Sequence, residues 1–181
     1  RNRRKFLLSQ FALSSKEGRY SWSKLDDIVD ASKLNVFKDT RNNQSDVVQG
    51  ELGDCYFLSV LAALAANPKN IAQLVDTNAR ASDSSFNTHV IIHGEPVNVV
   101  VDDYFPVAND RALAFAGISE NSGNIWPIIL EKAWAKCNKT YEDIIPGNSA
   151  DAFEFLSPAP FDTYYHNSET KPTLFETITN A

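Results

Sequence analysis

The chain has 181 residues, 43% of them hydrophobic, which predicts one folded domain and excludes disorder over the whole length. Its 17 basic and 23 acidic residues give a net charge of −6, which argues against nucleic acid as the main partner. Two cysteines do not make a disulfide framework and fit a reducing, intracellular compartment, which favours the cytoplasm. No stretch reaches the roughly 18 apolar residues of a transmembrane helix.

The first part of the chain is polar, with scattered aromatic residues, and residues 1–40 are interpreted as an N-terminal extension or lead-in. A short helix is predicted over Ser23 to Val29. Residues 38–46 are rich in charges and amides, which predicts a loop that leads into a glycine-containing turn over residues 49–54. The chain contains no methionine and does not begin with one, which favours a fragment or a processed form of a longer protein.

A central buried helix is predicted next. The run from Asp54 to Ala66 is apolar on nearly all sides, which is typical of a helix inside a core, and Asp54 is placed as its N-cap or as a first-turn acid. Asn67-Pro68 ends this helix. A shorter helix is predicted over Pro68 to Val75, followed by a loop over residues 76–88.

The middle of the chain predicts a small antiparallel β element. Its strands are His89 to His93 and Val97 to Asp102, separated by residues 94–96, and Asp102-Asp103 is expected to be an exposed strand end.

A second packed helix is predicted from Trp126 to Lys136, with Glu131, Lys132 and Lys136 on solvated or ion-paired faces. Beyond Tyr141 the pattern loosens. The predicted fold class is therefore α+β.

The most informative position is Cys55, at the junction between the glycine-containing turn and the central helix. Unpaired N–H groups at a helix N-terminus stabilise a thiolate, so a cysteine there has the surroundings of a nucleophile. Gln49 lies six residues upstream, with an amide that can donate to an oxyanion. The alternative is an inert buried helix cysteine, of which Cys137 is the example within this chain.

The decapeptide Gln-Gly-Glu-Leu-Gly-Asp-Cys-Tyr-Phe-Leu at residues 49–58 closely resembles the active-site signature of the calpain family of cysteine proteases. Two later segments resemble the family in order and spacing: Val97–Val101 followed by Asp102-Asp103 and Pro106, and the block from Trp126 through Lys136 to Glu142. Several ordered motifs together are far more specific than a lone cysteine pattern.

The resemblance implies the N-terminal, cysteine-bearing lobe of a papain-like protease core, over residues 41–160. Residues 161–181 are then a tail or the start of a connection to a C-terminal lobe. Cys55 would be the nucleophile and Gln49 the oxyanion donor of a thiol protease that hydrolyses peptide bonds in protein substrates.

The sequence departs from the family in what it lacks. The family's histidine lies in a Gly-His-Ala segment and its asparagine in an Asn-Pro-Trp segment, and neither segment occurs here. His166 lies 111 residues after Cys55 (166 minus 55), short of the roughly 130–150 residues of papain-like enzymes. His89 and His93 are expected to have surface or packing roles.

Calcium is the cofactor that the resemblance implies. Asp46 aligns with one carboxylate of the family's N-lobe ion site, and Asn124 stands where the second carboxylate is expected. An amide in place of a carboxylate removes a formal charge and weakens calcium binding. The alternative for Asp46 is a loop acid that accepts hydrogen bonds from nearby backbone N–H groups.

Two hypotheses follow. The first is a calpain-type cysteine endopeptidase lobe that is active only with a lobe that carries histidine and asparagine. The second is a non-catalytic calpain-like scaffold or binding module in a larger assembly. Whether the protein is an enzyme stays open at this point, because the catalytic histidine and asparagine are absent from these 181 residues.

Overall fold

The computed structural model describes residues 19–77 and 84–162, which form a mixed α+β structure. In these residues the helices are α2 (Leu25–Ile28), α3 (Cys55–Leu64), α4 (Pro68–Leu74), α5 (Trp126–Cys137) and α6 (Ser149–Leu156). The strands are β1 (Ser21–Lys24), β2 (Ser85–Ile92), β3 (Glu95–Asp102) and β4 (Tyr104–Val107), and short 3-10 turns cover Ala31–Lys33, Asn43–Asp46 and Glu142–Ile144. His166 lies outside the described residues, as does most of the predicted segment 161–181.

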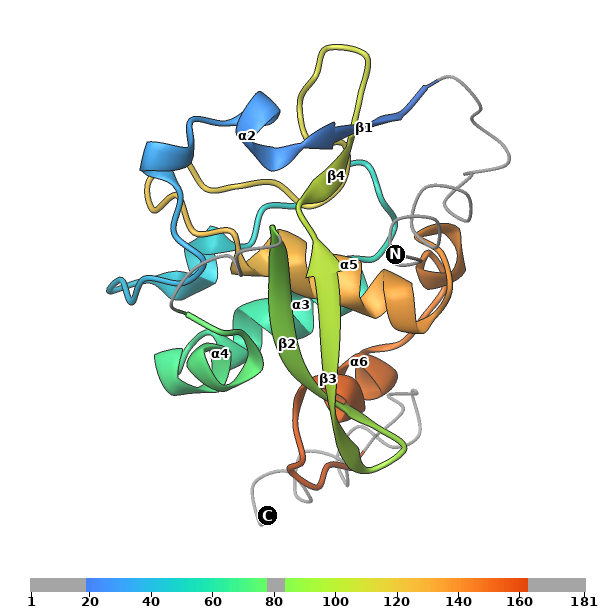
Figure 1. Cartoon of the computed structure of the whole chain (residues 1–181). Helices are drawn as coiled ribbons and strands as arrows, with labels where there is room; N and C mark the ends of the chain where they lie inside the picture. Colours follow the sequence, from blue (N-terminus) through green and yellow to red (C-terminus); the bar gives the residue numbers. More distant parts are fainter. Residues whose placement is uncertain (1–18, 78–83, 163–181) are drawn as a thin grey trace, which may run out of the picture.

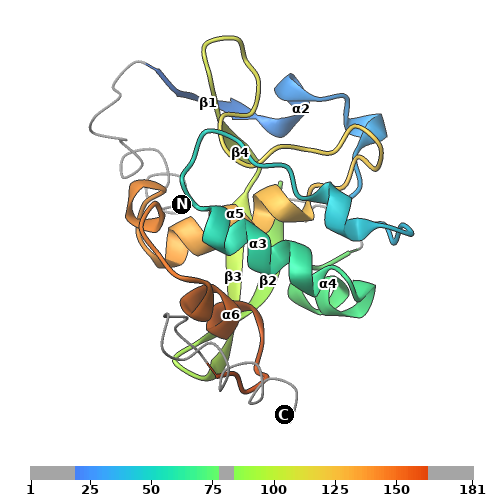
Figure 2. The same ribbon diagram turned by 180° about the vertical axis from the view of Figure 1, so that it is seen from behind.

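Helix α5 occupies the centre of the fold. In Figure 1 the β2–β3 hairpin lies in front of α5, and in the opposite view of Figure 2 α3 lies in front of it. α5 contacts both strands of the hairpin and α3. Because neighbours cover it on two sides, nine of its twelve residues are buried, which is more than the single apolar stripe that the sequence predicted.

The predicted central helix is confirmed as α3, which begins at Cys55. Its Phe57 and Leu61 are fully buried, and the Phe57 ring stacks on Trp134 of α5 with centroids 5.5 Å apart and planes 2° apart. Offset or stacked aromatic pairs of this kind add roughly 0.5–1.5 kcal/mol beyond burial. The start of α3 is thereby fixed against the centre of the fold.

The predicted hairpin is confirmed, with longer strands and a different turn. β2 and β3 pair antiparallel from Ser85 opposite Asp102 to Ile92 opposite Glu95. The turn is His93-Gly94, both with positive φ (52° and 79°), the backbone of the tight turns that join hairpin strands. The prediction of a loop through residue 88 is wrong from Ser85 onward.

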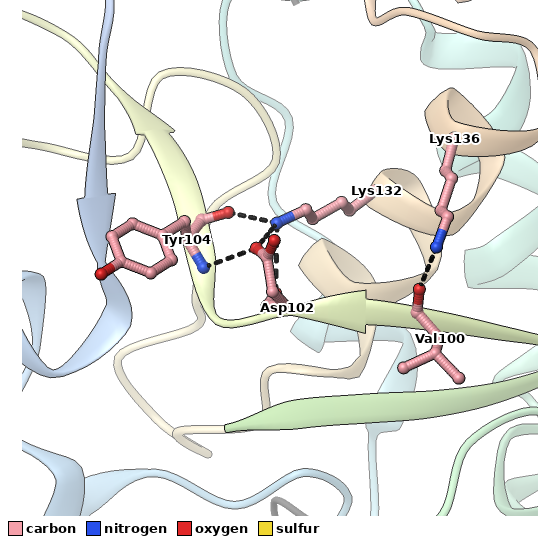
Figure 3. Close-up of polar contacts among 5 residues, drawn as sticks. All are labelled: Val100, Asp102, Tyr104, Lys132 and Lys136. Atoms are coloured by element: carbon pink, nitrogen blue, oxygen red, sulfur yellow. Dashed lines mark hydrogen bonds and ion pairs between the residues drawn. The ribbon is translucent and has the colours of Figure 1, made fainter. Parts of the chain in front are cut away.

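Of the predicted solvated or ion-paired residues, Glu131 and Lys132 are not solvated, because they are 2% and 1% exposed, but Lys132 is ion-paired with Asp102. Lys132 Nζ donates to the Asp102 carboxylate, to the Asp102 carbonyl oxygen at 3.1 Å and to the Tyr104 carbonyl oxygen (Figure 3). Lys136 donates to the Val100 carbonyl oxygen from the same helix. These bonds join α5 to the β3–β4 corner, so Asp102 is engaged with Lys132, and its neighbour Asp103 is buried rather than exposed.

Three elements differ from the sequence prediction. β1 was not predicted; it pairs antiparallel with β4 from Ser21 opposite Val107 to Lys24 opposite Tyr104. The short helix predicted over Ser23 to Val29 is the single turn α2. The chain does not loosen beyond Tyr141, because α6 follows with Asn148 as its N-cap. In the described ranges no helix is long and apolar enough to span a bilayer.

Candidate active site

Cys55 is the first residue of α3 and is exposed, whereas its neighbours Asp54, Phe57 and Leu58 are buried. The packed residues hold the helix end in place while the thiol faces outward. The first N–H groups of a helix have no partner within the helix, so the thiol lies beside backbone donors that favour a thiolate or an oxyanion. The junction predicted from the sequence is therefore present as a surface-accessible helix start.

Asp54 occupies the predicted N-cap position, but its side chain makes no capping hydrogen bond. It is fully buried and turned inward, where Oδ1 accepts a 3.3 Å hydrogen bond from Gln49 Nε2. Oδ2 accepts from no N–H or hydroxyl group of the described residues, and the Asp54 carboxyl group interacts with the carboxyl group of Glu131 on α5. Asp54 therefore links the start of α3 to the central helix through two carboxyl groups.

The shared proton of this pair is assigned to Glu131, whose pKa is raised more strongly than that of Asp54. Burial, and then the charge of Asp54, raise the pKa of Glu131 well above its usual range. Burial also raises the pKa of Asp54, while hydrogen bonds from Glu131 and Gln49 oppose that rise. The other oxygen of Glu131, Oε1, accepts from the backbone N–H of Ala116 at 3.0 Å. With this assignment, Glu131 donates to Asp54, and the pair carries a single negative charge next to the start of α3.

Gln49 lies on the loop before α3 and is exposed. Its amide nitrogen donates to the Leu52 carbonyl oxygen at 2.6 Å and to Asp54 Oδ1 at 3.3 Å. The amide group is thereby hydrogen-bonded within the turn that precedes α3. The loop is held against residues 114–117 by hydrogen bonds from Glu51 N to the Ala114 carbonyl oxygen and from Gly117 N to the Val48 carbonyl oxygen, both 2.9 Å.

Asp46 and Asn124 lie together, as the resemblance implied. Both side chains are fully buried, and Asn124 Nδ2 donates to Asp46 Oδ2 at 2.8 Å. Trp126 Nε1 donates to the same oxygen at 3.1 Å, while Asp46 Oδ1 has no hydrogen-bond partner. The donors to Asp46 are side chains of the α5 region rather than the nearby backbone N–H groups expected for a loop acid.

Neither histidine of the described ranges is directed at Cys55. The two ring nitrogens of His89 lie 2.7 Å from Asn98 Oδ1 and 2.8 Å from Asp76 Oδ1. His93 forms the hairpin turn. Within residues 19–77 and 84–162, no group of three or more His, Cys, Asp or Glu side chains is arranged to hold a metal ion.

Glu131 was not predicted to belong to the site. A signal was present: its neighbours three and four positions away along the helix are Pro127, Ile128, Trp134 and Ala135. Residues at these spacings share a helix face, so Glu131 stands in the middle of an apolar face. An acid in that setting indicates a buried carboxyl group with a specific partner.

An exposed cysteine at the start of a buried helix, with an amide donor on the preceding loop, is the kind of arrangement in which thiol-dependent hydrolases hold their nucleophile. Residues 3–181 match the family model described as "Calpain family cysteine protease". The chain belongs to the calpain family of cysteine proteases.

Several curated relatives are similar over most of the chain. The calpain-2 catalytic subunit of Gallus gallus is 34% identical over 141 residues, which cover 76% of this chain and 20% of the relative. The calpain-2 catalytic subunit of Homo sapiens is 32% identical over 171 residues, 93% of this chain and 24% of the relative. The calpain-type cysteine protease DEK1 of Zea mays is 40% identical over 115 residues, 64% of this chain and 5% of the relative. The chain therefore spans a quarter or less of the length of these relatives.

Proposed function

We propose that this chain is the N-terminal lobe of a calpain-type cysteine endopeptidase, with Cys55 as its nucleophile. The observation that carries the proposal is the place of Cys55 at the first residue of α3, where it is exposed beside the buried Asp54 and Phe57. The prediction that Cys137 is a buried helix cysteine is wrong, because Cys137 is exposed as well. Cys55 differs from it in lying at the N-terminus of a helix, whose N–H groups favour a thiolate, whereas Cys137 is the last residue of α5.

In the proposed reaction, the Cys55 thiolate attacks the carbonyl carbon of a peptide bond, and a C–S bond forms as the carbonyl oxygen becomes an oxyanion. The backbone N–H of Cys55 and the amide of Gln49 stabilise that oxyanion. The C–N bond then breaks, the amine leaves with a proton from a general acid, and water hydrolyses the thioester. Gln49 exchanges its longer hydrogen bond, 3.3 Å to Asp54, for the oxyanion.

The general acid and base is proposed to be a histidine on a second lobe, because both described histidines have other roles. His89 is bonded to Asn98 and Asp76, and His93 forms a turn. The cysteine-bearing lobe thus supplies the nucleophile and the oxyanion donors. The partner lobe supplies the proton transfer that each step needs.

The decisive experiment is Cys55→Ala in a protein that joins this lobe to the histidine-bearing lobe. We expect peptide hydrolysis to be lost, because no other group provides the covalent step. Turnover is measured with a fluorogenic peptide. The control is Cys137→Ser, at the end of α5, which should leave turnover within about twofold because Cys137 has no place in the mechanism. Unchanged hydrolysis in the Cys55→Ala variant would refute the proposal.

The second candidate function is a non-catalytic scaffold. The observation in its favour is the Gln49 amide, whose hydrogens are engaged by Leu52 and Asp54. In a scaffold, that arrangement would be permanent and the thiol would behave as an ordinary cysteine.

Labelling with iodoacetamide near neutral pH separates the two functions on the 181-residue chain itself. We expect Cys55 to react at least about tenfold faster than Cys137, because it lies beside the free N–H groups of a helix start whereas Cys137 lies at a helix end. Mass spectrometry of the peptides gives the two rates. Equal rates would favour the scaffold, and measurable peptide cleavage by this chain alone would contradict the need for a second lobe.

A further inference from the structure

The Asn124 side chain joins three separate segments of the chain. Its Oδ1 accepts from the Lys38 backbone N–H at 2.7 Å, and its Nδ2 donates to the Lys38 carbonyl oxygen and to Asp46 Oδ2, both at 2.8 Å. The orientation of the amide is fixed by these partners, since a backbone N–H requires the oxygen and a carboxylate requires the NH₂ group. Every polar atom of this buried side chain is therefore engaged.

Asp46 is the centre of this arrangement. It ends the 3-10 turn Asn43–Asp46, three residues before Gln49, and its Oδ2 accepts from Asn124 and from the Trp126 indole. Asn124 and Trp126 flank the start of α5. The bonds to Asp46 therefore fix the loop that carries Gln49 to the most deeply buried helix of the fold.

A calcium ion between Asp46 and Asn124 does not fit these contacts. Calcium takes six to eight oxygen ligands, about 2.3–2.6 Å from the ion. Here the Asn124 oxygen faces the Lys38 N–H, and the group that faces Asp46 is an NH₂, which presents a positive hydrogen where a cation would have to lie. Of the side-chain oxygens of Asp46 and Asn124, only Asp46 Oδ1 is left without a donor, and one side-chain oxygen does not make a calcium site.

We propose that the Asn124 amide takes the place of a divalent cation in this chain, so that the loop carrying Gln49 is held in position without calcium. In a site with two carboxylates, a cation would be needed to bring the like charges together. In this chain the neutral Asn124 amide faces the Asp46 carboxylate directly and donates a hydrogen bond to it, so no cation is needed between them. The proposal deepens the proposed function, because Gln49 is its oxyanion donor, but its test measures stability and does not depend on protease activity.

The test is the substitution Asn124→Asp in the 181-residue chain, followed by thermal unfolding in EGTA and in millimolar calcium. The variant loses the donor to Asp46 and faces one buried carboxylate with another. In EGTA we expect its unfolding midpoint to fall by about 10 °C. Calcium should then raise the midpoint of the variant by binding the new pair of carboxylates, whereas the wild-type midpoint should not respond.

Two matched variants complete the design. Asn35→Asp adds the same charge nearby, on a half-buried residue whose amide donates at 3.3 Å to the Ser122 carbonyl oxygen, and it should create no calcium response. The double variant Asp46→Asn with Asn124→Asp exchanges the amide and the carboxylate. It should recover most of the lost stability in EGTA, because one amide again faces one carboxylate.

Each result has a defined meaning. A wild-type midpoint that calcium raises by several degrees would overturn the proposal, as would an Asn124→Asp variant that is as stable as wild type in EGTA. If the Asn124→Asp variant does not fold in EGTA, two other measurements test the proposal. Calorimetric titration of the wild-type chain with calcium would refute it by showing heat of binding. The double variant would refute it by being no more stable than Asn124→Asp.

Discussion

Glu131→Leu is expected to lower the free energy of unfolding by about 3–5 kcal/mol, because it breaks a buried carboxyl pair and leaves the charge of Asp54 without its donor. The substitution also removes the acceptor of the Ala116 N–H, which is buried behind the loop that carries Gln49. Urea denaturation of the 181-residue chain, followed by tryptophan fluorescence, measures the loss. A loss below about 1 kcal/mol would show that the pair contributes little.

Glu131→Gln is the matched control, because its amide can donate to Asp54 and accept from Ala116 as the protonated acid does. It should be at least as stable as wild type near neutral pH, because its folding requires no uptake of a proton. Loss of stability equal to that of Glu131→Leu would contradict the assignment of the shared proton to Glu131.

Wild type and the Glu131→Gln variant should differ in how their stability responds to pH. The folded-state pKa of Glu131 is raised, so folding takes up a proton between the unfolded value, about 4.3, and the raised value. The stability that this proton provides is complete below about pH 4.3 and is lost as the pH rises through the folded-state pKa. Urea midpoints measured across this range should therefore shift in favour of the Glu131→Gln variant as the pH rises.

Gly50→Ala is expected to destabilise the chain by at least about 2 kcal/mol, because there is no room for a side chain at this position. A Cβ on Gly50 would lie 1.6 Å from the Phe115 carbonyl oxygen and 2.4 Å from its carbonyl carbon. Both atoms belong to the backbone. The loop can move away only by giving up the hydrogen bonds that Glu51 and Gly117 make across the same contact. The loss is measured as a shift of the urea midpoint.

Gly53→Ala provides the control within the same turn. A Cβ there would meet the Ile145 Cγ2 at 3.3 Å, which is the end of a side chain that can adjust. We expect a change below about 1 kcal/mol. If both substitutions cost the same, the close approach of residues 50 and 115 is not what holds the loop.

The position of Cys55 at a helix start is local information, and the sequence determined it. A glycine-containing turn, an N-cap position at Asp54 and a long apolar run all lie within residues 49–66, so α3 and its start at Cys55 follow from helix chemistry alone. The hairpin was predictable for the same reason, since β-branched residues flank a short turn that contains Gly94.

α6 was missed because its own sequence is ambiguous. Its eight residues, Ser-Ala-Asp-Ala-Phe-Glu-Phe-Leu, show no clear helical pattern. A stabilising contact comes from a residue distant in the sequence, because Phe155 packs against Trp134 with ring centroids 4.7 Å apart. Helices of this length are marginal without tertiary packing. Position in the fold, rather than propensity, makes this segment helical.

The tertiary structure decided the polar interior. Glu131 and Lys132 are residue types usually found in contact with solvent, and they are buried because α5 lies between α3 and the hairpin. Asp46 and Asn124 are 78 residues apart in the sequence, and only the packing of the loop on α5 turns the amide toward the carboxylate. Residue type predicts which side chains can donate or accept a proton or a hydrogen bond. Burial determines their partners, because a polar group without a partner in the interior destabilises the fold. The sequence alone thus determined the place of Cys55 at a helix start, and the fold determined which buried groups support it.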